Sequence, residues 1–200
     1  MAKIKFTKNE LKKQKDALKR FERYLPTLQL KKQQLQMEVR KIEEALHRKE
    51  REFEDLQRRT MEWVAVLGED VGLEELVAVE GIVTGTNNIA GVDIPVFEDI
   101  VFREKDYDLF ETPLWVDAAV ERLKDLLAVQ AEIEVLKEQA RLIREELRVT
   151  TQRVNLFEKV KIPETKENIR IIKIYLGDEQ TAAVVRGKIS KKKIVEKQAS

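Results

Sequence analysis

The chain has 200 residues, of which 38% are charged, and its formal net charge at neutral pH is only +1. Glycine, proline and aromatic residues are scarce, a composition typical of long helices rather than of a compact globular core. Cysteine is absent, which excludes disulfide and thiolate chemistry and favours a cytosolic setting. Because no run of about 18 apolar residues occurs, we expect no segment inserted in a membrane.

Apolar residues recur with a seven-residue period through the first third of the chain. Two such series form one seam between residues 11 and 67, and 13 of its 17 positions are apolar. The interruptions are Gln14, Lys32, Lys49 and Thr60. A heptad repeat of this length predicts a helix that pairs with another helix along its whole length.

Local signals set the limits of this helix. Thr7 and Glu10 have the spacing of a capping box, in which each side chain satisfies a free backbone N–H of the first turn. Gly68 and Gly72 are expected to end the helix near residue 67. Pro26 lies inside the seam and predicts a bend, because proline removes a backbone hydrogen bond and clashes with the preceding turn.

A second heptad seam near the other end of the chain supplies the partner helix. Thr112-Pro113 is expected to open it, since proline is favoured at the first helical position. Its seam residues are Ala119, Leu126, Val129, Ile133, Leu136, Ala140, Ile143, Leu147, Val154 and Phe157. After Pro163, where we expect a bend, the seam resumes one residue late. Gly177 and Gly187 are expected to weaken the last part of the helix.

The region between the two helices has a different pattern. Residues 75–103 contain β-branched residues in alternation around Gly and Asn, which predicts a β-hairpin with its turn at residues 85–88. Asn88, Gly91 and Pro95 are its distinctive residues, and Pro95 indicates an edge strand. Two strands alone are only marginally stable in water, so the hairpin must pack on the helices or on a partner.

The sequence therefore predicts a mainly all-α fold built as a long antiparallel two-helix coiled coil with a central β-hairpin and loop region. The N-terminal coiled-coil helix is expected over residues 1–67 and the central region over residues 68–112. The C-terminal coiled-coil helix, bent near Pro163 and ending in a basic tail, is expected over residues 113–200.

Charge is distributed unevenly along this rod. Residues 1–25 carry nine Lys and Arg against three acidic residues, and residues 184–200 carry six against Glu196 alone. Since the net charge is +1, the remaining chain is acidic. We expect the two ends to form one basic tip, either solvated or inserted into a negatively lined partner site. The candidate partner-binding residues are Lys8, Lys12, Lys13, Lys15, Arg186, Lys188, Lys191, Lys192 and Lys193.

A second apolar stripe lies beside the main seam of the C-terminal helix. Val116, Val120, Leu123 and Leu127 have helical spacing and would share one face. The stripe is expected to pack on the hairpin or on the end of the first helix, with docking of another subunit as the alternative.

No combination of residues predicts catalysis, a cofactor or a metal. Gly81, Gly85 and Gly91 lack the Gly-Lys-Ser/Thr sequence that would hold a phosphate. His47 is the one histidine and is expected to face solvent. The adjacent glutamates at 43–44 and 145–146 are expected on exposed helix faces rather than converging in a cleft.

Four segments of the chain resemble the D subunit of the V-type and archaeal A-type rotary ATPases, the central rotor shaft. Residues 88–98, Asn-Ile-Ala-Gly-Val-Asp-Ile-Pro-Val-Phe-Glu, are similar to the hairpin segment of the family. Residues 153–158, Arg-Val-Asn-Leu-Phe-Glu, followed by Ile162-Pro163, are similar to its Arg-Val-Asn-Ala-Leu-Glu and Ile-Pro pattern. The third segment is the lysine tail at 191–193. The fourth is Thr7-Lys8 at the start of the first helix, with Leu30-Lys31-Lys32 further on. Gly177 and Gly187 depart from the last helix of the family.

This resemblance implies a mechanical role rather than an enzymatic one. Both termini would enter a hexamer of alternating catalytic and regulatory nucleotide-binding subunits, with the small F subunit on the shaft. A funnel-shaped subunit would link the lower end to the proteolipid ring, so that the chain is cytoplasmic and peripheral to the membrane. The bend at Pro163 would make the shaft asymmetric.

Two other functions remain as alternatives. A prefoldin-like chaperone subunit also has two coiled-coil helices joined through β-hairpins, but its tips are apolar, whereas this chain carries charge at its ends. Nucleic-acid binding through the basic end is disfavoured, because no aromatic residues alternate with the lysines and the acidic shaft repels phosphate.

Overall fold

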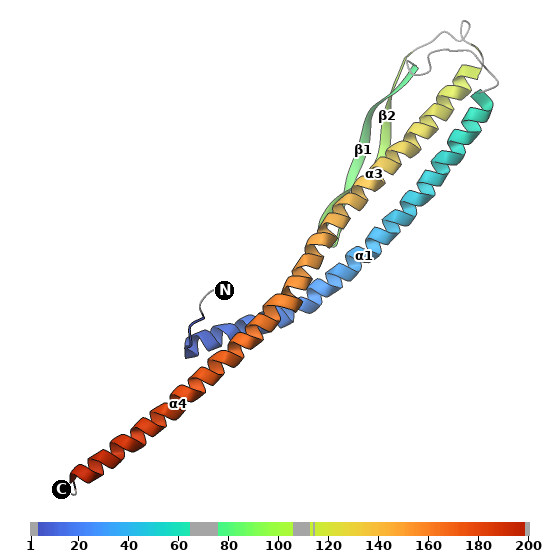
Figure 1. Ribbon diagram of the computed structural model, residues 1–200. Coiled ribbons are helices and arrows are strands. Elements are labelled where there is room, and N and C mark those ends of the chain that lie inside the picture. Colours follow the sequence, from blue (N-terminus) through green and yellow to red (C-terminus); the bar gives the residue numbers. More distant parts are fainter. Residues whose placement is uncertain (1–3, 65–75, 106–112, 114, 199–200) are drawn as a thin grey trace. The chain divides into compact units, whose positions relative to one another are not determined.

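The computed structural model describes residues 4–64, 76–105, 113 and 115–198 (Figure 1). In chain order, the elements are helix α1 (Lys8–Val64), strands β1 (Val77–Ile89) and β2 (Val92–Glu104), helix α3 (Trp115–Asn155), the π-helical segment η1 (Leu156–Lys161) and helix α4 (Ile162–Gln198). The expected fold, long helices from both ends of the chain with a β-hairpin between them, is confirmed. None of the helices in the described part of the chain combines the length and apolarity needed to span a bilayer.

The chain divides into two compact units, which are described separately. The hairpin unit comprises residues 31–149, and the terminal unit comprises residues 1–30 and 150–200. Each unit contains part of α1 and part of the C-terminal helical stretch.

The first helix begins as the sequence predicts. The backbone N–H of Glu10 donates to Thr7 Oγ1 at 3.2 Å, which is the N-terminal half of a capping box. In a full capping box the Glu10 carboxylate would accept a hydrogen bond from the Thr7 backbone N–H. Here it accepts one from Gln14 Nε2 at 2.9 Å instead. The helix continues through Pro26, and its described part ends at Val64. The predicted end at Leu67, Gly68 and Gly72 lies outside the described residues.

The heptad seam is the buried side of α1. Throughout residues 11–60, every seam position is buried or half-buried, including the four polar interruptions. In the hairpin unit, Leu35 and Ile143 are fully buried, and they form one core cluster with Val39, Ile42, Ala140 and Ile94. Residues of α1, α3 and β2 therefore build this core together, and the hairpin closes the side that two helices leave open.

The hairpin turn is tighter and later than predicted. Residues 85–88 belong to β1 and pair with β2, and the turn is Ala90-Gly91. Both turn residues have positive φ, 52° and 80°, as a two-residue type I′ turn requires. Asn88 Oδ1 accepts from the Gly91 N–H at 3.0 Å, while Asn88 Nδ2 donates to Asp93 Oδ1 at 2.6 Å. The prediction at 85–88 was wrong because Gly and Asn there are equally suited to a turn, and the strand pairing places the turn at residues 90–91 instead. Asn88 supports the turn from the strand.

The second apolar stripe is covered by the hairpin. Val116 and Val120 are buried against Val77 of β1, with Phe102, Trp115, Leu123 and Leu127 packed around them. The first two residues of the stripe, Val116 and Val120, are only 1% and 6% exposed, whereas Leu123 and Leu127 are half-buried. Docking of another subunit at this face stays a prediction. Helix α3 starts at Trp115, with Pro113 preceding it and accepting a hydrogen bond from the Val116 N–H. Thr112 lies outside the described residues.

The one-residue slip near Pro163 has a different cause from the one predicted. Residues 156–161 form a π-helix, and the N–H of Ile162 donates to the carbonyl oxygen of Phe157, five residues back. A π-helical turn contains about one extra residue, so the seam moves by one position. Accordingly, Ile169 and Ile172 are buried in α4. Proline fits directly after this segment because it has no N–H to donate.

Helix α4 is more regular than expected. It continues through Gly177 and Gly187 to Gln198, so the predicted weakening at these glycines does not interrupt the helix. In the terminal unit, Phe6 stacks on Tyr175 with ring centroids 4.9 Å apart, and Phe21 contacts Phe157 at 5.3 Å. The N-terminal segment therefore covers its partner helix as far as Tyr175.

Candidate partner-binding surfaces

The predicted basic residues all lie in the terminal unit and are exposed. Lys8, Lys12, Lys13 and Lys15 project from the first turns of α1, and Arg186, Lys188, Lys191, Lys192 and Lys193 project from the end of α4. Elsewhere on the helices, Arg141, Arg148 and Arg170 each pair with a carboxylate three residues away. The basic ends thus combine high positive charge with accessibility.

The two basic segments are not gathered into one tip. The ring of Phe6, just before the first basic segment, stacks on Tyr175 of α4. Arg186, the first residue of the second basic segment, lies eleven residues beyond Tyr175, which corresponds to roughly 17 Å of helix at 1.5 Å per residue. The expectation of a single tip placed both chain ends at the same level and was wrong, since α4 is longer than its partner segment. The positive charge is spread along one end of the unit.

The last part of α4 also exposes apolar side chains. Val184, Val185 and Ile194 are 59%, 49% and 58% exposed, and Ile189 and Val195 are similarly open. Consecutive residues of an α-helix point about 100° apart, so these side chains and the intervening cations surround the helix instead of forming one stripe. A helix that is apolar on several sides is normally enclosed by protein.

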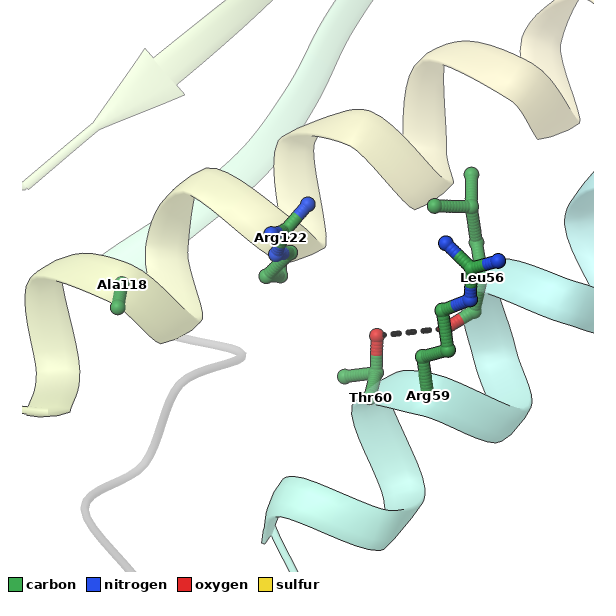
Figure 2. Close-up of a pocket in the computed structure, with 5 residues that line it drawn as sticks. All are labelled: Leu56, Arg59, Thr60, Ala118 and Arg122. Carbon is green, nitrogen blue, oxygen red and sulfur yellow. Dashed lines mark hydrogen bonds between the residues drawn. The ribbon is translucent and has the colours of Figure 1, made fainter.

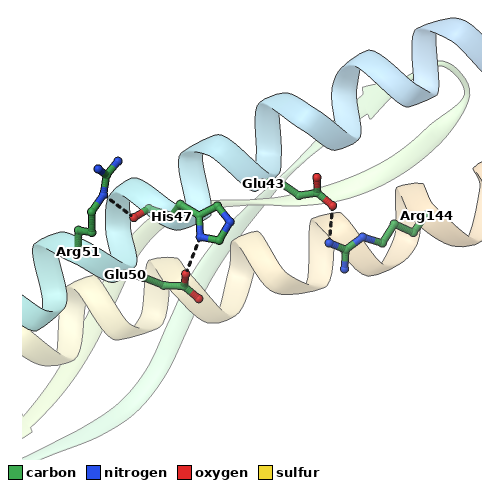
Figure 3. A network of polar contacts seen from close by, with 5 residues as sticks. All are labelled: Glu43, His47, Glu50, Arg51 and Arg144. Carbon is green, nitrogen blue, oxygen red and sulfur yellow. Dashed lines mark hydrogen bonds and ion pairs between the residues drawn. The ribbon is translucent and has the colours of Figure 1, made fainter.

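The hairpin unit carries ordered surface charge. In the hairpin unit, Arg144 Nη2 donates to Glu43 Oε1 at 2.6 Å and joins α3 to α1 (Figure 3). His47 is exposed as predicted, with Nδ1 3.2 Å from Glu50 Oε2. No cluster of His, Cys, Asp or Glu suited to a metal occurs among the residues that the structure describes.

Hydrogen bonds within α3 and α4 lower the pKa of three exposed glutamates. Arg141 lowers the pKa of Glu138, Arg148 that of Glu145, and Arg170 that of Glu167, in each case chiefly by direct side-chain hydrogen bonding. These groups stay ionised near neutral pH. They are fully exposed pairs one helical turn apart, so their role is to keep the surface charged and well solvated.

Lys49 is the polar interruption with a defined structural role. It lies half-buried in the α1 seam, with Nζ 2.5 Å from Glu132 of α3 and 3.1 Å from Glu52. The hydrogen bond with Glu132 raises the pKa of Lys49. Sequence reasoning treated Lys49 only as a break in the heptads. A lysine at a seam position that faces a glutamate on the partner helix is the signal that could have identified this cross-helix pair.

Comparison with known proteins identifies the family. The family model of the ATP synthase D subunit matches residues 10–192. The V-type ATP synthase D subunit of Borreliella burgdorferi is 51% identical over 197 residues, covering 98% of both chains. The Chlamydia felis and Chlamydia caviae proteins of the same name are 35% and 36% identical over 96% of this chain and 93% of their own length. The chain belongs to the D-subunit family of V-type ATP synthases.

The family relationship settles the general assignment. The chain is a subunit of a V-type rotary ATPase, and the resemblance drawn from residues 88–98 and 153–163 is confirmed. A prefoldin-like chaperone and a nucleic-acid-binding arm are not supported by any of these matches.

Proposed function

We propose that this chain is the central-stalk rotor shaft that transmits torque between the membrane ion-translocating ring and the catalytic hexamer of a V-type ATPase. It would do so without catalytic residues, metal or cofactor of its own, on the cytoplasmic side and peripheral to the membrane. The observation that supports this most directly is the α4 end, a continuous helix whose exposed cationic and apolar side chains surround it. Such a helix is suited to being enclosed on all sides by other subunits.

The hairpin unit supplies the stiffness that torque requires. Its two helices are joined by a common core with the β-hairpin and by cross-helix ion pairs of Lys31 with Glu146, Glu43 with Arg144, and Lys49 with Glu132. Charged pairs between helices resist sliding of one helix along the other, because sliding separates the partners. We infer that the small F subunit and the funnel-shaped subunit bind the shaft outside the hexamer.

The basic end is expected to hold the shaft inside the hexamer of catalytic and regulatory nucleotide-binding subunits. Replacing Lys191, Lys192 and Lys193 with Gln should weaken association of the tagged chain with the hexamer. The loss should be greater in low salt than in high salt, because ions screen charges that are exposed to solvent. Lys41, Lys105 and Lys137, which are exposed in the hairpin unit, changed together to Gln form a control with equal loss of charge outside the terminal unit. Equal affinities for both triple variants would refute the assigned role.

The π-helical segment with Pro163 is the proposed source of asymmetry in the shaft. Pro163→Ala restores a backbone donor and favours an ordinary α-helix, which would shift the seam back by one residue. We expect ATP hydrolysis to continue while ion pumping per ATP falls, because the faces after residue 162 no longer match their partners. Full coupling in this variant would contradict the role of the segment. Glu164→Ala, one residue further on and exposed, is the matched control.

Native purification of the tagged chain from its own cells tests the assignment as a whole. The rotor function predicts three copies each of two nucleotide-binding subunits for each shaft, released together in strong salt. Recovery of one coiled-coil partner in equal amount with assorted unfolded proteins would instead support a chaperone.

A further inference from the structure

A cavity lies between α1 and α3 in the hairpin unit, close to the end of α1 and the start of α3 (Figure 2). Its volume is about 290 Å³, and its described lining is Leu56, Arg59, Thr60, Ala118 and Arg122. Thr60 occupies a seam position where a larger apolar residue would fill the space, and its hydroxyl donates to the Leu56 carbonyl within the same helix at 2.8 Å. The two helices therefore leave a gap here that neither fills.

The cavity contains two positive groups and, among its described lining residues, no carboxylate. Arg59 comes from α1 and Arg122 from α3, so each helix contributes one positive charge to the lining (Figure 2). Arg122 is 3.6 Å from Asp125, and its side chain is 60% exposed. Arg59 forms no ion pair with any residue that the structure describes, whereas the adjacent Arg58 is 2.6 Å from Asp55. Arg59 is therefore the charge of the lining that no described residue neutralises.

The shape and chemistry of the lining indicate the class of ligand. Arginine guanidinium groups bind carboxylates in a planar, two-point geometry. Leu56 and Ala118 add apolar surface, which the methylene groups of a glutamate or aspartate side chain would cover. A free phosphate ion would satisfy the charge but would leave this apolar surface without a partner.

We propose that this cavity binds an acidic side chain of a partner subunit that lies outside the nucleotide-binding hexamer. The proposal rests on the function proposed above, in which the hexamer encloses the terminal unit and leaves the hairpin unit to other subunits. It adds Arg59 and Arg122 as specific binding residues, which no sequence motif indicated.

The test is a double variant, Arg59→Gln with Arg122→Gln, in the tagged chain purified from its own cells. The retained amount of each partner subunit is measured relative to the wild type. We expect one partner outside the hexamer to be retained at least about tenfold less, because charge-assisted hydrogen bonds are lost. The nucleotide-binding subunits should be retained unchanged. Arg58→Gln, which removes an arginine from the same turn but not from the cavity, should retain every partner.

The outcomes separate this proposal from the proposed function. If the wild-type chain retains no nucleotide-binding subunits, the rotor function itself fails. If the wild type retains the complete complex and the double variant retains it equally, only the cavity proposal is overturned. An unchanged melting temperature of the double variant shows that lost binding is not lost folding, as expected for exposed side chains.

A third experiment distinguishes a partner carboxylate from a free anion. Inorganic phosphate is titrated into the purified chain while the Nε–Hε NMR signals of Arg59 and Arg122 are followed. Saturable shifts together with unchanged partner retention in the double variant would show a small-anion site and overturn the proposal. Because the chain contains no cysteine, Ala118→Cys also gives a unique thiol in the cavity. This thiol should react with a neutral maleimide in the isolated chain and be protected in the complex.

Discussion

The hairpin unit and the terminal unit use the same heptad seam but bury it to different extents. In the hairpin unit, α1, α3 and the hairpin all contribute fully or nearly fully buried side chains, such as Leu35, Ile143 and Ile94. In the terminal unit, none of the described residues 4–30 reaches that degree of burial, and the buried residues all lie on the partner segment from Thr150 to Ile172.

The difference shows what a third layer contributes to a two-helix seam. Two helices cover only one side of each other, so seam residues stay half-exposed unless another element covers them. The β-hairpin does this in the hairpin unit, while the terminal unit lacks such an element among its described residues. The first unit therefore has a core of its own, and the second leaves apolar side chains of α4 exposed.

The largest expected effect comes from the core of the hairpin unit. Ile143→Ala removes a fully buried side chain and leaves a cavity, which should lower the free energy of unfolding by about 2–5 kcal/mol. Ile174→Ala in the terminal unit changes a side chain that is 52% exposed and should cost less than about 1 kcal/mol. Urea denaturation of both variants measures the contrast, and equal losses would refute the difference between the units.

The next largest effect concerns the attachment of the hairpin. Gln139 is buried, and its Nε2 donates to the Pro95 carbonyl at 2.6 Å. Gln139→Ala leaves the Pro95 carbonyl without this hydrogen-bond donor and should lower the free energy of unfolding by about 1–3 kcal/mol. The exposed Gln130→Ala is the control. Amide hydrogen exchange in β1 and β2 should accelerate only in the Gln139 variant, and unchanged exchange would show that the hairpin is held by apolar packing alone.

The turn of the hairpin allows two substitutions of opposite sign. Gly91 has φ of +80°, so Gly91→Ala introduces a strained side chain and should destabilise the fold by about 1 kcal/mol. Ala90 already has a left-handed φ of 52°, and Ala90→Gly should relieve part of that strain. Thermal melting measures both. The same sign for the two changes would argue against the type I′ turn.

Much of this architecture follows from periodicity. The heptads predicted which side chains of α1 are buried, because helix pairing depends on the regular spacing of apolar residues. The position of the hairpin turn did not follow, since Asn and Gly at 85–88 are equally suited to a turn and only the pairing of both strands decides the register. Likewise, the one-residue slip was visible in the sequence, but its π-helical cause is a backbone hydrogen-bond pattern.

The candidate binding surfaces were only partly predictable. The excess of lysines near both chain ends can be read directly from the sequence, and the structure shows that these side chains are exposed. The Arg59–Arg122 cavity was not predictable, because its residues are far apart in sequence and meet only when α1 and α3 pair. Thr60 was noted as an interruption, but a small residue on one helix creates a cavity only where its partner helix also offers a small residue, here Ala118.

The smallest expected effect is at Lys49, where a lysine replaces an apolar residue in the seam. Its pKa is raised in the folded protein by the hydrogen bond with Glu132, so protonation is favoured more in the folded than in the unfolded state. The resulting stabilisation is complete below the unfolded pKa of about 10.4 and is lost as pH rises through the higher folded value. Lys49→Met removes this contribution and should change stability by less than about 1 kcal/mol at neutral pH, because the pair is half-exposed.

The pH dependence of unfolding isolates this contribution. The difference in stability between the wild type and the Lys49→Met variant should stay constant from neutral pH to about pH 10 and then shift in favour of the variant. Lys41→Met, which removes an ion pair confined to α1, is the control for general loss of a lysine. A difference between the wild type and Lys49→Met that does not vary with pH would mean that Lys49 contributes through its methylene packing. In that case, the cross-helix pair would not add to the stiffness of the hairpin unit.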